Sequence, residues 1–209
     1  MEIAYVVKPL SARDIEIDSV RFLMSYHDKF LLGKERSLDV ERAADSIFMD
    51  KNFTLQLVGD HDLPKEVLAC TEMDSCIIKV RESDYNKCDY DGMSRMNIMH
   101  EIGHARLQSD QIHATGILYS VVGNTIPAYK NSEWQAKVWG SATLMPYPRM
   151  IKIIDRMKGA SERRIINEIC EEFKVTEPAA KVRFETIQKY RADGRATGIE
   201  ATLKQWNLI

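Results

Sequence analysis

The segment SRMNIMHEIGHARLQSD, residues 94–110, constrains this chain more than any other. Its apolar spacing predicts a helix over residues 93–108. His100 and His104 are four positions apart, so on a helix both imidazoles lie on one face, one turn from each other. Glu101 follows the first histidine directly. Burying two imidazoles and a carboxylate without a shared partner would cost several kcal/mol of desolvation, which favours a common partner for these groups.

This spacing is the HExxH motif, in which two histidines hold one metal ion. Two imidazoles a turn apart can both reach an ion at the ~2.0–2.1 Å typical of zinc–nitrogen bonds. Glu101 lies to one side, where a carboxylate can take a proton from the attacking water and pass it to the leaving amine. Gly103 leaves room for metal or substrate at a helix-propensity cost of about 1 kcal/mol, while Ile98, Ile102 and Ala105 face the core. The alternative is a structural helix whose histidines are satisfied by hydrogen bonds.

A catalytic zinc usually has three protein ligands and one water, so a third ligand is required. Asp110 lies six residues after His104, where some extended zincin motifs place that ligand. Those motifs use a glycine to end the helix, and Leu107 stands at that position. The other candidate is Glu133, at the start of a later predicted helix, although a first-turn glutamate can instead simply interact with the helix dipole. From spacing alone, Asp110 is the weaker candidate and Glu133 stays open.

The rest of the chain predicts an α+β fold. Helical patterns cover residues 11–32, with Ser11 as N-cap, and residues 37–49. Strand patterns follow at residues 53–58, 66–73 and 75–82. A later helix, with Ser132 as N-cap, covers residues 132–145. We therefore expect a small twisted sheet with a zincin-like HExxH helix, followed by a helical C-terminal region.

The C-terminal quarter resembles a helix-turn-helix. Residues 161–190 read as a helix, a short turn and a second helix, with Thr176 as N-cap and Pro178 in the first turn. One interpretation is DNA binding through the second helix, but a major-groove reader needs phosphate-contacting cations around that helix. Here the basic residues are few and interrupted by acidic ones: Lys181, Arg183 and Lys189 against Glu177 and Glu185. We favour a helical pair that packs on the preceding domain or docks a protein, with nucleic acid as the less favoured partner.

Length and composition fit one globular domain with a helical addition, which we divide at residues 1–147 and 148–209. The charge is uneven, because residues 149–209 carry 13 Lys+Arg and 9 Asp+Glu while the whole chain has a net charge of -2. Such an asymmetry hints at two functional halves but is too weak to indicate DNA binding.

The sequence also predicts a cytoplasmic protein without membrane contact. The N-terminal segment lacks the basic and long apolar regions of a signal peptide, and no apolar run approaches the roughly 20 residues that span a bilayer. The cysteines form no CxxC pair, which favours reduced thiols. The alternatives are a regulatory disulfide or a second metal site among the first three cysteines. The four cysteines are Cys70, Cys76, Cys88 and Cys170.

Two segments together resemble a known family. RMNIMHEIGHARLQ followed by EWQAKVWGSATLMP resembles the signature of the ImmA/IrrE family of metallopeptidases, in which a glutamate stands three residues before an alanine and the helix ends in Leu-Met-Pro. The matching positions are Arg95, His100, Glu101, His104, Glu133, Ala136, Leu144, Met145 and Pro146. The likeness covers residues 12–146 in layout, with specific motifs only in 95–146. Three positions depart from the family pattern: Lys137, Trp139 and Gln108.

The resemblance implies a zinc-dependent endopeptidase in which Glu133 is the third metal ligand beside His100 and His104. Glu101 would be the general base and then the general acid. The expected cofactor is Zn²⁺, with Mn²⁺ as the alternative for a mixed His/Glu donor set.

The family likeness also implies a narrow substrate, a helix-turn-helix transcriptional repressor that is cut once to release genes of a mobile element or a stress response. The donor that stabilises the oxyanion stays open, and His113, Tyr119 and Tyr129 lie in the right region of the sequence. Two other classes of function stay open. One is a DNA- or repressor-binding module with a non-catalytic zinc site, and the other is a zinc hydrolase acting on another amide substrate.

Overall fold

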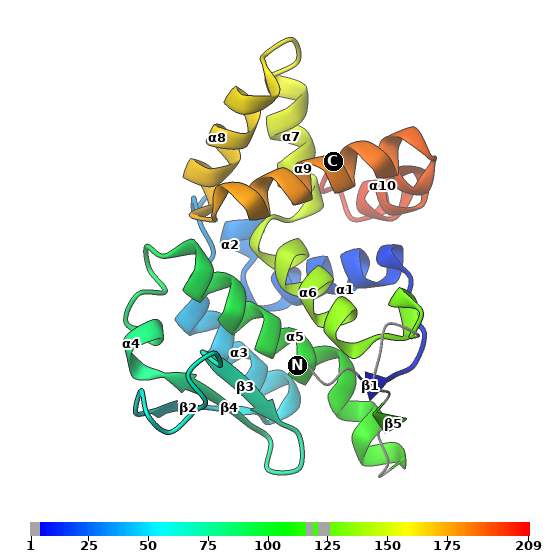
Figure 1. The fold of residues 1–209 in the computed structure, drawn as a ribbon. Helices are drawn as coiled ribbons and strands as arrows, with labels where there is room; N and C mark the ends of the chain where they lie inside the picture. Colours follow the sequence, from blue (N-terminus) through cyan, green and yellow to red (C-terminus); the bar gives the residue numbers. More distant parts are fainter. Residues whose placement is uncertain (1–4, 116–118, 121–125) are drawn as a thin grey trace.

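The computed structural model describes the backbone of residues 5–115, 119–120 and 126–209, and the side chains of residues 5–110 and 126–209. It confirms the predicted α+β class (Figure 1). A small sheet lies at one end of the molecule and the C-terminal helices lie at the other. Two helices run between them, α5 (Gly92–Thr115) and α6 (Ser132–Leu144).

Helices α1 (Ala12–Tyr26), α2 (Asp28–Leu31) and α3 (Val40–Lys51) precede the sheet. The predicted N-cap Ser11 is confirmed: its hydroxyl oxygen accepts from the N–H of Asp14, and the Asp14 carboxylate accepts from the N–H of Ser11. Helix α3 begins later than the sequence pattern indicated, because Asp39 caps it. Helix α3 packs against α5, the helix that carries the HExxH motif, and so supports it.

The sheet consists of three strands at the predicted positions, in the order β2 (Thr54–Val58), β4 (Ile77–Arg81) and β3 (Ala69–Glu72). Strand β2 is parallel to β4, whereas β3 is antiparallel to β4 and forms an edge. The N–H of Arg81 donates to the carbonyl of Leu68. In the alternating antiparallel pattern, the backbone groups of Ala69 and Thr71 therefore point away from β4, along the free edge.

Four shorter elements complete the N-terminal part: β1 (Tyr5–Val6), α4 (Glu82–Tyr85), β5 (Tyr119–Ser120) and η1 (Ala128–Lys130). Strand β1 pairs antiparallel with β5. The N–H of Tyr5 also donates to the hydroxyl of Ser132. This bond attaches the N-terminal strand to the start of α6.

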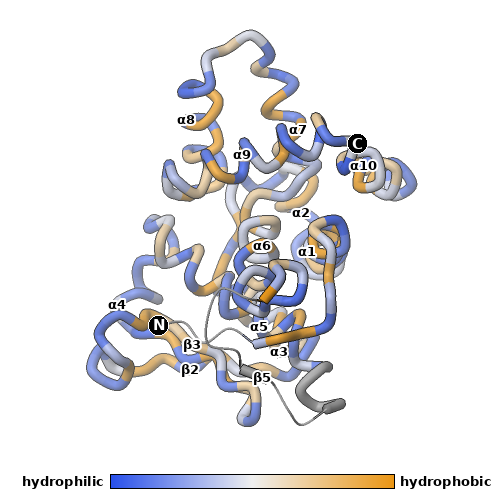
Figure 2. Tube along the Cα trace, turned by 45° about the vertical axis from the view of Figure 1, so that its right-hand side comes forward, coloured by the Kyte–Doolittle hydropathy of each residue, from blue (hydrophilic) through white to orange (hydrophobic). Residues whose placement is uncertain are grey.

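Four helices form the C-terminal region: α7 (Tyr147–Arg156), α8 (Glu162–Phe173), α9 (Glu177–Ala192) and α10 (Arg195–Gln205). Apolar and polar stretches alternate along α8, as expected for an amphipathic helix (Figure 2). The N-cap of α9 is Thr176, as predicted, and α8 packs against α9. The fold therefore contains the predicted helix-turn-helix-like pair.

Helix α9 is fastened to α1 by a buried ion pair. Arg183 and Glu16 are 2% and 0% exposed, and both terminal nitrogens of the guanidinium donate to the carboxylate. The Nε of Arg183 donates to the carbonyl of Met145. Burial opposes the charge of Arg183, but Glu16 outweighs this and raises the pKa of the guanidinium. Arg183 is thus occupied inside the protein, and the helix presents only Lys181 and Lys189 of its three expected cations.

Replacing Arg183 by methionine is expected to destabilise the protein by about 3–5 kcal/mol, because Glu16 would remain as an uncompensated buried charge. Urea denaturation of the two proteins measures the difference. The matched control is Arg156→Met, which removes an exposed ion pair with Glu168 and should cost at most about 1 kcal/mol. Equal losses in the two variants would contradict the assignment of a buried ion pair.

One apolar core extends through both parts of the chain. It contains Trp139 of α6 as well as Met150 of α7 and Ile187 of α9, all of them buried. The division at residues 147 and 148 stays a prediction. None of the helices in the described part of the chain combines the length and apolar character that a bilayer-crossing segment requires.

Candidate metal centre

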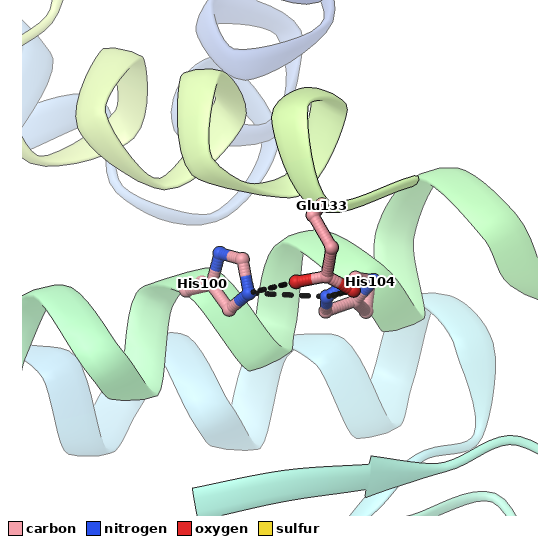
Figure 3. Close-up of side chains that lie close together, drawn as sticks. All are labelled: His100, His104 and Glu133. Atoms are coloured by element: carbon pink, nitrogen blue, oxygen red, sulfur yellow. Dashed lines mark hydrogen bonds and ion pairs between the residues drawn. The ribbon is translucent and has the colours of Figure 1, made fainter. Parts of the chain in front are cut away.

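Three side chains from two helices converge on one point (Figure 3). His100 and His104 come from consecutive turns of α5, and Glu133 comes from the first turn of α6. The Nε2 atoms of the two histidines are 3.1 Å apart. The carboxylate oxygens of Glu133 lie 3.1 Å from Nε2 of His100 and 3.3 Å from Nε2 of His104. Among the described side chains, this is the one group of three His, Cys, Asp or Glu residues with metal-binding spacing.

The three side chains fit a divalent metal ion. A tetrahedral ion with bonds of ~2.0–2.1 Å separates its ligand atoms by about 3.3–3.4 Å, close to the observed distances. Two imidazoles and one glutamate are also the donor set of one common type of catalytic zinc site. Without a cation or protons between them, the three groups would face one another with lone pairs alone.

Helix α6 reaches α5 because small residues line the crossing. A Cβ atom on Gly103 would lie 2.8 Å from the carbonyl oxygen of Ala136, and one on Gly140 would lie 3.0 Å from the backbone of Met99. The expectation that Gly103 leaves room for metal or substrate is therefore wrong. Its missing side chain admits the backbone of α6, and this close crossing brings Glu133 to the histidines.

The start of α6 differs by one residue from the predicted start. Ser132 was expected as N-cap, but it is the first helical residue, and the side chain of Asn131 accepts from the N–H of Trp134. Ser132 is buried and receives the N–H of Tyr5 instead. Asn131 therefore sets where the helix begins, and Glu133 falls in its first turn.

Asp110, the rival third ligand, does not reach the histidines. Its side chain is 77% exposed and pairs with Lys51 at 2.7 Å. Helix α5 continues past it to Thr115, because no glycine ends the helix after His104. Asp110 therefore lies on a different part of the surface.

The two histidines differ in the hydrogen bonding of Nδ1, the ring nitrogen that faces away from the meeting point. Nδ1 of His104 lies 2.5 Å from Oε1 of Gln108, a buried side chain. Nδ1 of His100 is buried and has no hydrogen-bond partner among the described residues. Gln108 was noted in the sequence only as a departure from the family pattern, so this contact is one that sequence reasoning missed.

The charges within the group are strongly coupled. Burial disfavours the ionised form of Glu133, but hydrogen bonds with His100 and His104 outweigh it and hold the pKa of Glu133 well below its usual range. Burial also opposes the charge of His104, and its bond with Glu133 raises the pKa of His104 nonetheless. Positive charge is therefore favoured at the point where the three side chains meet.

Glu101 is held beside this group by a strand of the sheet. The hydroxyl of Thr71, on β3, lies 2.7 Å from Oε2 of Glu101 and 3.0 Å from its carbonyl oxygen. Burial raises the pKa of Glu101, and the nearby His104 and His100 only partly oppose this. Nothing in the local sequence around Thr71 indicates this contact, which joins residues 30 positions apart.

The group opens into a cavity of about 790 Å³. Leu68 and the β3 residues Ala69–Thr71 line the cavity, as do Glu101 and the three converging side chains. Tyr5 and Asn97 also line it and can donate hydrogen bonds, although the sequence did not single them out. Of the three residues considered earlier as oxyanion donors, Tyr129 is 48% exposed, whereas the side chains of His113 and Tyr119 lie outside the described residues.

Arg95, which matches the family pattern, and Trp139, which departs from it, both serve the packing around the helices. Arg95 is 1% exposed and donates to the carbonyls of Cys88 and Leu38, which ties α5 to the preceding loop and to the segment before α3. Trp139 is buried and donates from Nε1 to Asp18 of α1. None of the four cysteines, all of which lie in the described part of the chain, forms a disulfide.

Comparison with known protein families finds a match. Residues 85–185 match the model of a peptidase family, M78, described as the IrrE N-terminal-like domain. The matched segment begins at the end of α4 and ends within α9. It includes the three converging residues and Glu101. No curated protein matches the sequence. The family match agrees with the resemblance seen in the two sequence segments.

Proposed function

We propose that this chain, whose residues 85–185 match the peptidase family of IrrE N-terminal-like domains, is a zinc-dependent endopeptidase. One observation carries the proposal: His100, His104 and Glu133 converge beside the buried Glu101 in an open cavity. Metal ligands without a base would suit a structural site, and a base without a cavity could not meet a substrate. This chain combines all three features.

We assign His100, His104 and Glu133 as the ligands of the ion. When bound, zinc would act as a Lewis acid that lowers the pKa of a water molecule and polarises the scissile carbonyl. The ligand residues themselves hold their geometry through the close crossing of α5 and α6. A mixed His/Glu set also accepts Mn²⁺, so the identity of the metal is part of the test below.

Glu101 is proposed as the general base and then the general acid. Thr71 bonds to Oε2, which leaves Oε1 of Glu101 free to accept a proton from the attacking water and to return it to the leaving amine. The raised pKa of Glu101, caused first by burial, moves this carboxyl toward the range in which a general base works best at neutral pH. Tyr5 and Asn97 are available in the same cavity to stabilise the oxyanion.

The cavity supports a peptide as substrate. Ala69 and Thr71 direct their backbone N–H and C=O groups along the free edge of β3. An extended peptide can pair with such an edge through main-chain hydrogen bonds. Because Thr71 also contacts Glu101 through its side chain, a peptide paired there would lie next to the general base.

We further propose that the substrate is a helix-turn-helix transcriptional repressor, on the strength of the family resemblance alone. Cleavage of such a repressor would release the genes that it silences, and it would place the activity in the cytoplasm. The C-terminal helices of this chain are the candidate region for docking the repressor, since α9 presents an exposed outer face that includes Val182.

Incubation with candidate repressors tests the proposal. Zinc-loaded protein is expected to cut its repressor at one site, chelator-treated protein to cut nothing, and protein reloaded with zinc to cut again. Reloading with Mn²⁺ in a parallel sample identifies which ion supports the faster reaction. An unrelated unfolded protein, added as a second substrate, should stay whole.

Two other results would contradict the proposal. Cleavage that continues in the chelator would contradict a metal-dependent reaction. Repressors that stay whole under every condition, while a short peptide amide is hydrolysed, would support the alternative of a zinc hydrolase with another substrate.

A further inference from the structure

We propose that Gln108 is a positioning residue that couples the two helices of the metal centre, because its amide orients His104 and anchors the residue before Glu133. This inference rests on the metal centre assigned above. It concerns how that centre is held together, and no ligand role is required of Gln108 itself.

Both ends of the Gln108 amide are engaged. Its Nε2 donates to the carbonyl oxygen of Ser132 at 3.1 Å, and its Oε1 lies 2.5 Å from Nδ1 of His104. The side chain is only 2% exposed, so water does not replace these partners readily. Gln108 lies four residues after His104 on α5, which puts the two side chains on one face of the helix.

These contacts determine the tautomer of His104. A carbonyl oxygen can only accept, so the NH₂ group of Gln108 must face Ser132 and its oxygen must face the imidazole. That oxygen can in turn only accept, so Nδ1 of His104 carries the hydrogen. Nε2 of a neutral His104 then presents its lone pair to the point where the three side chains meet, as a metal ligand requires.

The second contact reaches the other helix. Ser132 is the first residue of α6 and directly precedes Glu133. Its hydroxyl accepts from Tyr5 of β1, and its carbonyl accepts from Gln108 of α5. A single amide therefore holds one ligand directly and holds the start of the helix that carries another.

No equivalent contact supports the remaining ligand. Nδ1 of His100 is buried without a hydrogen-bond partner among the described residues, so no hydrogen bond fixes the side of this ring that faces away from Glu133. The loss of Gln108 would consequently leave neither histidine with a hydrogen bond at Nδ1 among the described residues. We therefore expect the affinity for zinc to depend strongly on this side chain.

Zinc binding measured by competition with a fluorescent chelator tests the proposal without any substrate. Gln108→Met keeps the length and apolar bulk of the side chain but removes both hydrogen bonds. It is expected to weaken zinc binding by about 10- to 100-fold, the usual effect of losing an outer-shell partner. The visible spectrum of the Co²⁺-substituted protein should change with it, because that spectrum reports the geometry of the ligands.

Gln135→Met is the matched control. Gln135 is 0% exposed on α6, and its amide donates to the carbonyls of Lys8 and Tyr129, away from the three ligands. The control loses a buried amide in the same way, so its stability should fall while its zinc affinity and Co²⁺ spectrum stay near those of the wild type.

Gln108→Glu supplies the rescue. It keeps an oxygen that can accept from Nδ1 of His104 but loses the donor to Ser132, so its zinc affinity should lie between those of the wild type and Gln108→Met. It also keeps the proposal testable if Gln108→Met does not fold.

Two results would overturn the inference. One is wild-type zinc affinity in Gln108→Met, and the other is a Gln108→Glu variant no better than Gln108→Met. A wild-type protein that binds no zinc would instead remove the proposed function itself, so the two failures can be told apart.

Discussion

Substituting Glu101 by glutamine is expected to slow cleavage of the proposed repressor substrate by about 10²- to 10⁴-fold while the protein keeps its metal. The amide has nearly the shape of the carboxylate, and its carbonyl oxygen can still accept from Thr71. It cannot take a proton from water and return it to the leaving amine. Time courses of cleavage give the loss of rate, and elemental analysis gives the zinc content per chain.

Glu72→Gln is the control for this substitution. Glu72 is one residue after Thr71 on the same strand, but it is exposed and pairs with Lys79. The Glu72→Gln protein should therefore cleave the substrate at the wild-type rate. A Glu101→Gln protein that holds zinc and cleaves as fast as Glu72→Gln would show that another group transfers the proton.

Replacing Glu133 by alanine is expected to weaken zinc binding strongly. Losing an outer-shell contact weakens metal binding by about 10- to 100-fold, and losing this ligand should weaken it by more. The two imidazoles would remain, but the carboxylate that lies 3.1 Å from one and 3.3 Å from the other would be gone. The wild-type protein should gain about 2.7 kcal/mol of stability at a free zinc concentration 100 times its Kd. The variant should gain almost none at that concentration, and thermal unfolding with and without zinc measures both.

Asp110→Ala provides the comparison, because Asp110 was the rival for the third ligand. Its exposed carboxylate pairs with Lys51, so its loss should leave zinc binding unchanged. Each variant is compared with itself with and without zinc, since Glu133 also bonds to the histidines in the metal-free protein. The opposite ranking of the two variants would return Asp110 to the centre and remove Glu133 from it.

The HExxH part of the candidate centre could be predicted from spacing because helical periodicity is a local property. A separation of four residues places His100 and His104 on one face in any α-helix. The same reasoning placed Ile98, Ile102 and Ala105 on the opposite face, where all three are buried. The Ser11 cap and the three strands of the sheet followed from equally local patterns.

Glu133 could not be chosen from spacing, because 33 residues separate it from His100. The family resemblance pointed to it, and the crossing of α5 and α6 explains how it arrives. That crossing depends on Gly103 and Ala136 together, which is why Gly103 alone was misread as space for the metal. Thr71 and Gln108 were missed for a similar reason, since hydroxyl and amide side chains have no distinctive pattern in a sequence.

The C-terminal region shows the same limit. Its helix-turn-helix pattern was evident from the apolar spacing and from Thr176, but the partner of Arg183 was not. That partner, Glu16, lies 167 residues away, and it turns an expected surface cation into a buried one.

The amino-acid sequence by itself determined where the main helices and the three strands of the sheet lie, and it determined that two histidines lie one turn apart on one face of a helix with a glutamate beside them. Those features depend only on neighbours within a few residues. The tertiary structure alone decided which distant groups meet them: Glu133 with the histidines, Thr71 with Glu101, and Gln108 with Ser132. Each of these contacts requires two separate elements to pack at one particular distance, and packing of that kind depends on the whole core.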